Sequence, residues 1–69
     1  MLGQRIKDYL IKKGIKQSFL VAETGLTADA ISNICNGTRK IDAVEYYNIC
    51  KALGVPLETF FTDDEESEE

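Results

Sequence analysis

The sequence predicts an all-α fold, a compact bundle of five short helices followed by a disordered acidic C-terminal tail. Apolar residues recur at helical spacings of three and four along the body of the chain, and they nowhere alternate with the period of two that is typical of strands. Glycines interrupt this pattern at intervals that suit short helices. With 69 residues, the chain allows a single domain with a small core.

The first predicted helix covers about residues 2–13. Its apolar residues recur at spacings of four, three and one and therefore share one buried face: Leu2, Ile6, Tyr9 and Leu10. Lys12 and Lys13 place positive charge beside the negative end of the helix dipole, and Gly14 provides the stop.

The second and third predicted helices form a short pair joined by a glycine turn. The second begins near Gln17 and ends at Gly25, and the third has Thr27 as its expected N-cap and stops at Asn36-Gly37. The apolar residues expected to hold the pair together are Leu20, Val21, Leu26, Ile31 and Ile34.

Asp42 is the expected N-cap of a fourth helix, which ends at Gly54. We expect this helix to bury the apolar residues Val44, Tyr47, Cys50 and Leu53. Pro56 suits the first turn of a fifth helix, one to two turns long, that passes through Leu57, Phe60 and Phe61.

The charge is divided unevenly along the chain. Residues 63–69 read DDEESEE, whereas residues 1–62 carry eight basic and six acidic side chains, so the formal net charge of −4 describes the tail rather than the body. An acidic run with nothing apolar to bury is expected to stay disordered and to aid solubility. The alternative is that the tail competes with phosphate groups for the basic surface of the body.

Several function classes are disfavoured by composition. Histidine, the commonest general base and metal ligand, is absent, and no cluster of carboxylates has catalytic or metal-ligand spacing, so we expect no enzyme, metal or cofactor. Cys35 and Cys50 are expected to be buried thiols in a reducing compartment, with a disulfide between them as the alternative. No apolar run could span a membrane, and no signal peptide is visible, which predicts a cytoplasmic protein. The core is too small for an effector pocket.

The pair of helices over residues 17–36 carries the functional signal. A short glycine turn forces a sharp crossing between two helices of eight or nine residues. The polar or small residues left outside on the second helix are Ala28, Asp29, Ser32 and Asn33. This geometry can lay a recognition helix in the major groove of DNA, although a plain helical hairpin has the same spacing.

A set of short motifs follows in a fixed order along the chain. They are Gln17 at the start of the second helix, Gly25-Leu26-Thr27, Ile31-Ser32-Asn33-Ile34, Asn36-Gly37 with a basic turn after it, and Ala52-Leu53-Gly54-Val55. This ordered set resembles the Cro and lambda-repressor-like (Xre) helix-turn-helix family, over residues 3–61. The resemblance implies a lambda-repressor-like DNA-binding domain at residues 1–62, with the helix-turn-helix at 17–36 and the acidic tail at 63–69.

The resemblance further implies a transcriptional regulator, a repressor from a phage or mobile element, that binds double-stranded DNA. The recognition helix, about residues 28–35, would enter the major groove. The implied base contacts are Ala28, Asp29, Ser32 and Asn33. The implied phosphate contacts are Lys16, Gln17, Thr27, Asn36, Thr38, Arg39 and Lys40. Because the recognition helix has no Lys or Arg, affinity is expected to come from Lys16, Arg39 and Lys40, supplemented by Arg5 or Lys7.

A homodimer on a palindromic operator is the expected assembly, because one recognition helix reads few base pairs. The family resemblance and the apolar C-terminal segment place the expected dimer interface at Pro56, Leu57, Phe60 and Phe61. The alternative function is a protein-interaction module, an antitoxin or anti-repressor, that uses the helix-turn-helix body and the acidic tail. Its supporting features are the tail, Asp29 on the reading surface and Phe19.

Overall fold

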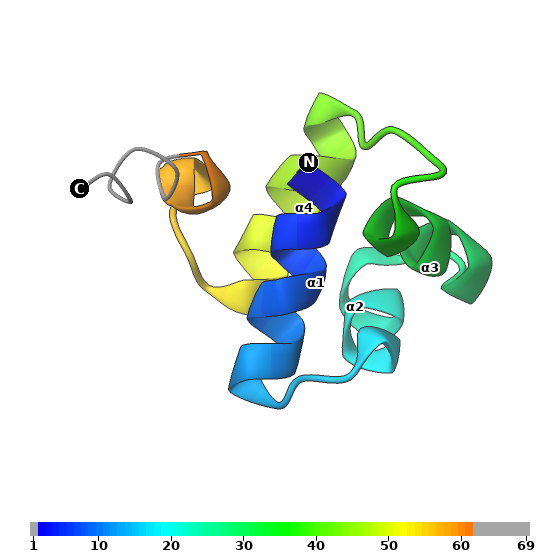
Figure 1. Ribbon diagram of the computed structural model, residues 1–69, viewed down its shortest axis with the longest axis horizontal. Coiled ribbons are helices and arrows are strands. Elements are labelled where there is room, and N and C mark those ends of the chain that lie inside the picture. Colours follow the sequence, from blue (N-terminus) through cyan, green and yellow to red (C-terminus); the bar gives the residue numbers. More distant parts are fainter. Residues whose placement is uncertain (1, 62–69) are drawn as a thin grey trace.

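The computed structural model describes residues 2–61, in which all the secondary structure is helical (Figure 1). Four α-helices precede one 3-10 helix: α1 (Leu2–Lys13), α2 (Gln17–Thr24), α3 (Ala28–Asn36), α4 (Ala43–Leu53) and η1 (Leu57–Phe60). The all-α prediction is therefore confirmed, and the expected fifth helix is a single 3-10 turn. None of the described helices is long and apolar enough to cross a membrane. The predicted acidic tail lies outside the described residues.

The helices pack so that α3 and η1 lie on opposite sides of the molecule (Figure 1). Helix α3 packs against α1 and α2, and α2 also packs against α4. The 3-10 helix η1 rests on α1 and α4. One side of the domain is therefore formed by α3, and the other by the C-terminal segment (Figure 1).

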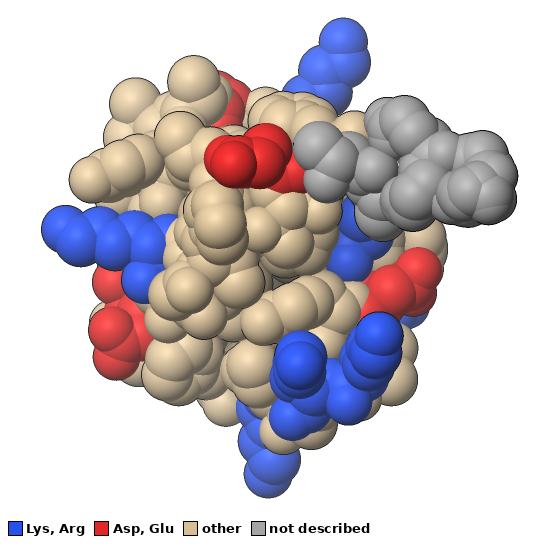
Figure 2. Space-filling view, turned by 90° about the vertical axis from the view of Figure 1, so that its left-hand side faces the viewer, with Lys and Arg blue, Asp and Glu red and all other residues tan. Residues whose placement is uncertain are grey.

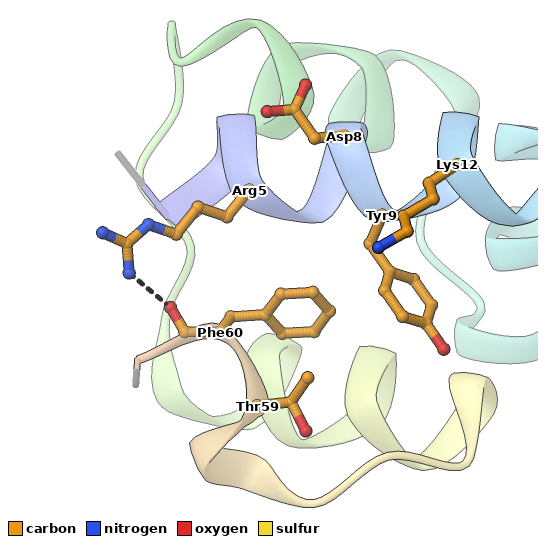
Figure 3. Close-up of a pocket in the computed structure, with 6 residues that line it drawn as sticks. All are labelled: Arg5, Asp8, Tyr9, Lys12, Thr59 and Phe60. Carbon is orange, nitrogen blue, oxygen red and sulfur yellow. Dashed lines mark hydrogen bonds between the residues drawn. The ribbon is translucent and has the colours of Figure 1, made fainter. Parts of the chain in front are cut away.

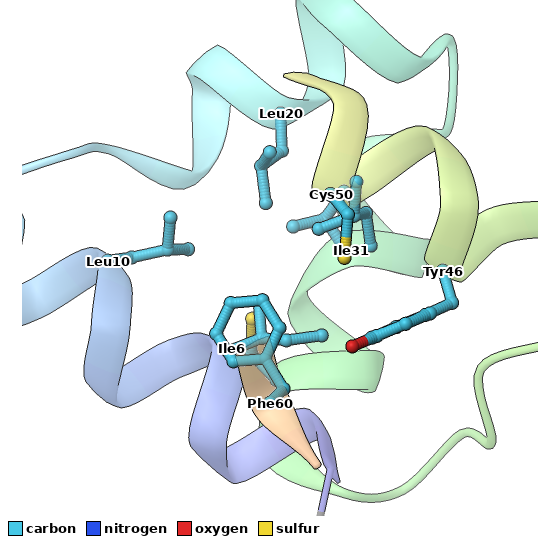
Figure 4. Close-up of a cluster of buried hydrophobic side chains, with 9 residues drawn as sticks. Ile6, Leu10, Leu20, Ile31, Tyr46, Cys50 and Phe60 are labelled. Carbon is cyan, nitrogen blue, oxygen red and sulfur yellow. The ribbon is translucent and has the colours of Figure 1, made fainter. Parts of the chain in front are cut away.

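The core lies between all five elements, and each contributes to it (Figure 4). Its buried hydrophobic members are Ile6, Leu10, Leu20, Ile31, Cys35, Tyr46, Ile49, Cys50 and Phe60. Burying an aliphatic or aromatic side chain of this size contributes roughly 1.5–3 kcal/mol. Phe60 closes the core from the η1 side, with its ring edge-on to the rings of Tyr9 and Tyr46 at centroid distances of 5.5 and 6.3 Å.

The prediction for the buried face of α4 was correct for Cys50 but wrong for Val44 and Tyr47, and Leu53 is half-buried. Val44 and Tyr47 are 68% and 51% exposed, whereas Tyr46 and Ile49 are buried beside Cys50. The helix carries apolar residues around more than one face, so periodicity alone does not select the inner one. The packing of η1 selects it, because the Tyr46 ring contacts Phe60 and Phe61 and its hydroxyl donates a hydrogen bond to the Leu57 carbonyl.

The two predicted N-caps are confirmed. The Thr27 hydroxyl accepts a hydrogen bond from the Ala30 amide at 3.0 Å. Asp42 forms a capping box with Glu45: the Asp42 carboxylate accepts from the Glu45 amide at 2.8 Å, and the Glu45 carboxylate accepts from the Asp42 amide at 3.2 Å. Side-chain caps of this kind stabilise a helix by about 1 kcal/mol each. Thr27 thus fixes where α3 begins, and Asp42 fixes where the loop after α3 ends and α4 begins.

The α1–α3 contact is closer than the sequence indicated. Gly3 is buried on α1, and a Cβ atom added to it would lie 1.9 Å from the Ile34 carbonyl oxygen of α3. Only glycine fits a contact in which one helix meets the backbone of another. Gly3 therefore sets how deeply α3 is seated.

Both cysteines are buried and unpaired, as predicted. Burial raises the pKa of the Cys35 thiol, an effect that the nearby positive charge of Lys7 opposes. Burial likewise raises the pKa of the Cys50 thiol. Neither side chain is in the exposed, thiolate-favouring environment that reactive cysteines require.

Candidate nucleic-acid interface

The turn between α2 and α3 is built from Thr24 and Gly25. Gly25 has φ +78°, in the left-handed region that favours glycine, and its amide donates to the Val21 carbonyl at 3.1 Å. The Thr24 hydroxyl donates to the Leu20 carbonyl at 2.6 Å and accepts from the Leu26 amide at 3.2 Å. The glycine was predicted from the sequence. Thr24, which fixes the approach to α3 with two further hydrogen bonds, was not.

Helix α3 has an apolar inner face and a polar outer face. The inner face consists of Ile31, Ile34 and Cys35, which are fully buried. The predicted base contacts share the outer side, since helical spacing places them together: Ala28, Asp29 and Asn33 are exposed and Ser32 is half-buried. We call these four residues the reading face. The buried stripe holds the helix, so the reading face is available for a ligand.

The chain leaves α3 through a turn that wraps around one carbonyl group. The Asn33 carbonyl oxygen accepts hydrogen bonds from the Thr38 and Arg39 amides at 3.0 and 3.2 Å, and from the Thr38 hydroxyl at 3.3 Å. Gly37, with φ +82°, makes this turn possible. The end of α3 and the basic turn are therefore one connected unit.

The predicted phosphate contacts differ in their surroundings. Lys16, Asn36, Thr38 and Lys40 are exposed, and Gln17 is half-buried at the first position of α2. The Thr27 hydroxyl is engaged as the N-cap acceptor of α3. The Arg39 guanidinium is bonded through Nη2 to the Glu45 carboxylate. The structure thus couples Arg39 to α4, a contact that was not predicted from the sequence. The D-x-x-E spacing of Asp42 and Glu45 is typical of a capping box, but it gives no sign that Arg39 is a partner.

Arg5, which the sequence analysis included among possible cations for DNA, is directed to the other side of the molecule. Its Nη1 donates to the Phe60 carbonyl at 2.8 Å (Figure 3). It lines an open depression of about 280 Å³ between α1 and η1, with the other lining residues Asp8, Tyr9, Lys12, Thr59 and Phe60. Arg5 therefore attaches η1 to α1. Within residues 2–61, no group of three His, Cys, Asp or Glu side chains could hold a metal ion.

The residues expected at a dimer interface divide between surface and core. Phe61 is 55% exposed, and Pro56 and Leu57 are also exposed, but Phe60 is 3% exposed and fills the core. Phe60 is therefore removed from the surface that a partner could contact. Its burial follows from the 3-10 turn, which directs it between α1 and α4.

An apolar groove of about 330 Å³ lies beside these exposed residues. Its lining residues are Leu2, Ile41, Asp42, Ala43, Tyr46, Tyr47, Leu57 and Phe61. Figure 2 views the molecule from the η1 side and shows uncharged surface over the middle of this face, with most charged side chains toward its edges. The exposed Tyr47 extends the apolar surface from η1 onto α4.

Comparisons with known proteins agree with this arrangement. The family profile of the Cro/C1-type HTH DNA-binding domain matches residues 5–66, which include α2, α3 and the turn between them. A relative from Rhodospirillum rubrum, named "Uncharacterized transcriptional regulator in ATPase CF(0) region", is 32% identical over 62 residues. The matched region is 90% of this chain and 57% of the relative, so the chain spans little more than half of that protein's length.

Proposed function

Because the chain belongs to the Cro/C1-type helix-turn-helix DNA-binding family, we propose that it is a sequence-specific regulator of transcription that inserts α3 into the major groove of duplex DNA. The observation that carries this proposal is the two-faced α3. Its inner side is fully buried and its outer side presents amide, hydroxyl and carboxylate groups to solvent. We further propose that it represses transcription by occupying its operator.

The reading face offers a complementary group for several base edges. The Asn33 amide can bond an adenine bidentately, which is worth about 1–3 kcal/mol of discrimination. Asp29 can accept from a cytosine amino group, Ser32 can bond either donors or acceptors, and the Ala28 methyl can contact a thymine methyl. A reading face with these groups and no cation would supply specificity rather than affinity.

Affinity would come from groups on either side of α3. The proposed phosphate contacts are Lys16, Gln17, Thr27, Asn36, Thr38, Arg39 and Lys40. Phosphate contacts fix register and make binding dependent on salt. Three of these contacts are cationic, Lys16, Arg39 and Lys40, so a dimer should show a log–log salt slope of about −5.

We propose that a homodimer binds a palindromic operator through two copies of α3. The proposed interface comprises Pro56, Leu57 and Phe61, extended by Tyr47 across the apolar groove. Phe61→Glu would place a charge on this surface, while Phe60 keeps the core closed. We expect the variant to remain folded but to sediment as a monomer and to bind operator at least about 10-fold more weakly. Unchanged dimerisation of the folded variant would contradict this interface.

The proposed division of the chain is a DNA-binding domain at residues 1–62 and an acidic tail at residues 63–69. The first experiment is selection of binding sites from a random duplex library at about 150 mM salt, with the full chain and with residues 1–62. An enriched palindrome that Asn33→Ala with Ser32→Ala abolishes is the expected result. Enrichment only without the tail would make the tail a regulator of binding.

The absence of any enriched site for both chains would contradict DNA reading and favour the alternative, a protein-interaction module. One observation supports that alternative. Phe19 is exposed beside an open depression of about 500 Å³ that is also lined by Gly14, Ile15, Lys16 and Ser18. The same samples, tested for co-purifying proteins, would then identify the partner.

A further inference from the structure

Arg39 joins the end of α3 to the start of α4. Its backbone amide donates to the Asn33 carbonyl at 3.2 Å, and its guanidinium Nη2 donates to the Glu45 carboxylate. The second oxygen of the same carboxylate accepts from the Asp42 amide at 3.2 Å. Glu45 is therefore held by the capping box on one side and holds Arg39 on the other.

The two partners differ in their exposure to solvent. The Glu45 side chain is 12% exposed, whereas the Arg39 side chain is 39% exposed. A guanidinium has five N–H donors in a planar fork, and only Nη2 donates to a protein group here. Within residues 2–61, Nη1 is buried and has no hydrogen-bond partner. The guanidinium is thus anchored at Nη2. Because the unpaired Nη1 is closed to solvent, a phosphate can contact only the part of the side chain that remains exposed.

We propose that Glu45 is a positioning residue for DNA binding, which it serves through Arg39 without touching DNA itself. This inference rests on the proposed function. The carboxylate fixes the guanidinium of a residue whose backbone amide is bonded to the Asn33 carbonyl, at the end of the reading face. A phosphate approaching this point would meet a fork whose side-chain conformation is already restricted. Preorganisation of this kind improves affinity by reducing the conformational entropy lost on binding.

The direction in which one substitution changes DNA affinity distinguishes a positioning role of Glu45 from a simple effect of its charge. A carboxylate near a polyanion repels it, so neutralising Glu45 would tighten binding if only its charge mattered. If Glu45 positions Arg39, the same substitution weakens binding. Glu45→Gln suits this test because glutamine also completes a capping box, so the start of α4 is preserved.

The matched control is Asp42→Asn, which removes one negative charge from the same loop and retains an N-cap side chain. For a dimer on the selected operator, we expect Glu45→Gln to raise Kd about 5-fold or more, and Asp42→Asn to leave Kd unchanged or to lower it. The salt slope of Glu45→Gln should be shallower by about 2, because each lost phosphate contact per subunit accounts for about 0.9. Phosphate-ethylation interference should lose one position per half-site.

A double-substitution cycle tests whether the effect passes through Arg39. In an Arg39→Gln background, Glu45→Gln should produce no further loss. Arg39→Lys keeps the charge but lacks the fork, so it should weaken binding to a similar extent even if Glu45→Gln fails to fold. Equal or tighter binding by folded Glu45→Gln, an additive loss in the double variant, or full affinity of Arg39→Lys would overturn the proposal. Wild-type chain that selects no duplex site would instead contradict the proposed function itself.

Discussion

On the α3 side of the molecule, the exposed polar residues and the buried residues that hold the helix are different side chains. On the η1 side, one aromatic side chain holds a single 3-10 turn against the core. Asn33 and Asp29 are exposed above a fully buried stripe. Phe60 instead fills the gap between α1 and α4. The α3 side can therefore change its surface chemistry with little effect on the fold, whereas on the η1 side a core residue and a surface residue are neighbours in the chain.

Among these variants, Phe60→Ala should lower the free energy of unfolding most. Removing the ring would leave a cavity between the rings of Tyr9 and Tyr46, and should lower the free energy of unfolding by about 3–5 kcal/mol. Urea unfolding followed by circular dichroism measures the loss. The matched control is Phe61→Ala, one residue away, which should cost less than about 1 kcal/mol. Equal losses for the two variants would show that η1 is packed differently.

Gly3→Ala tests the close packing of α1 against α3. The added methyl would meet the Ile34 carbonyl oxygen, which is backbone and cannot move without shifting α3. We expect a loss near the upper end of the roughly 1–3 kcal/mol typical of overpacking. Gln4→Ala, at the exposed neighbouring position on α1, should change the free energy of unfolding by less than about 0.5 kcal/mol. A neutral Gly3→Ala would indicate that α1 and α3 are farther apart.

Asn33→Ala tests whether the reading face of α3 can change without a loss of stability. Its unfolding free energy should stay within about 0.5 kcal/mol of wild type, while operator binding should lose about 1–3 kcal/mol per half-site. Fluorescence anisotropy with the selected operator and with single-base variants measures both affinity and specificity. Asn36→Ala is the companion variant, and because Asn36 is a proposed phosphate contact, its loss should weaken binding to all sequences equally. Loss of stability in Asn33→Ala would show that its side chain supports the helix.

The smallest expected effect is on the pH dependence of the free energy of unfolding. It arises from Tyr46, whose hydroxyl bonds the Leu57 carbonyl of η1. Burial raises the pKa of Tyr46 to about 12 from 10.0, so the folded state favours the protonated phenol. This contribution is complete below pH 10 and is lost as pH rises toward 12. By pH 11 the loss should be on the order of 1 kcal/mol. Urea unfolding at pH 9 and pH 11 should show this extra loss in wild type and its absence in Tyr46→Phe, and identical pH dependence would contradict it.

Local signals made most of the fold predictable from the sequence. Glycine stops and the N-caps Thr27 and Asp42 act within one turn of a helix, so they predicted where helices begin and end. The buried face of α4 was not predictable in this way, because Val44 and Tyr46 both belong to helical apolar stripes. Which stripe is buried depends on where η1 packs, and that is a contact between segments far apart on the chain.

The candidate site shows the same division between local and distant information. The exposure of Asn33 and Asp29 followed from the helical period of α3. The partner of Arg39 did not, because the loop conformation decides whether its guanidinium reaches Glu45 or solvent. Gly3 was equally invisible as a contact residue, since its importance comes from a backbone that passes close to it in space.

At Asn33 the backbone and the side chain have separate roles: the carbonyl group holds the turn after α3, and the side chain is the proposed base contact. The turn after α3 needs only the backbone oxygen, which every amino acid supplies, whereas the proposed base contact needs the amide side chain. Substitution at this position would therefore alter which DNA sequence is recognised while leaving the scaffold unchanged. Gene duplicates could acquire new operators through single codon changes, without an intervening stage of unfolded protein.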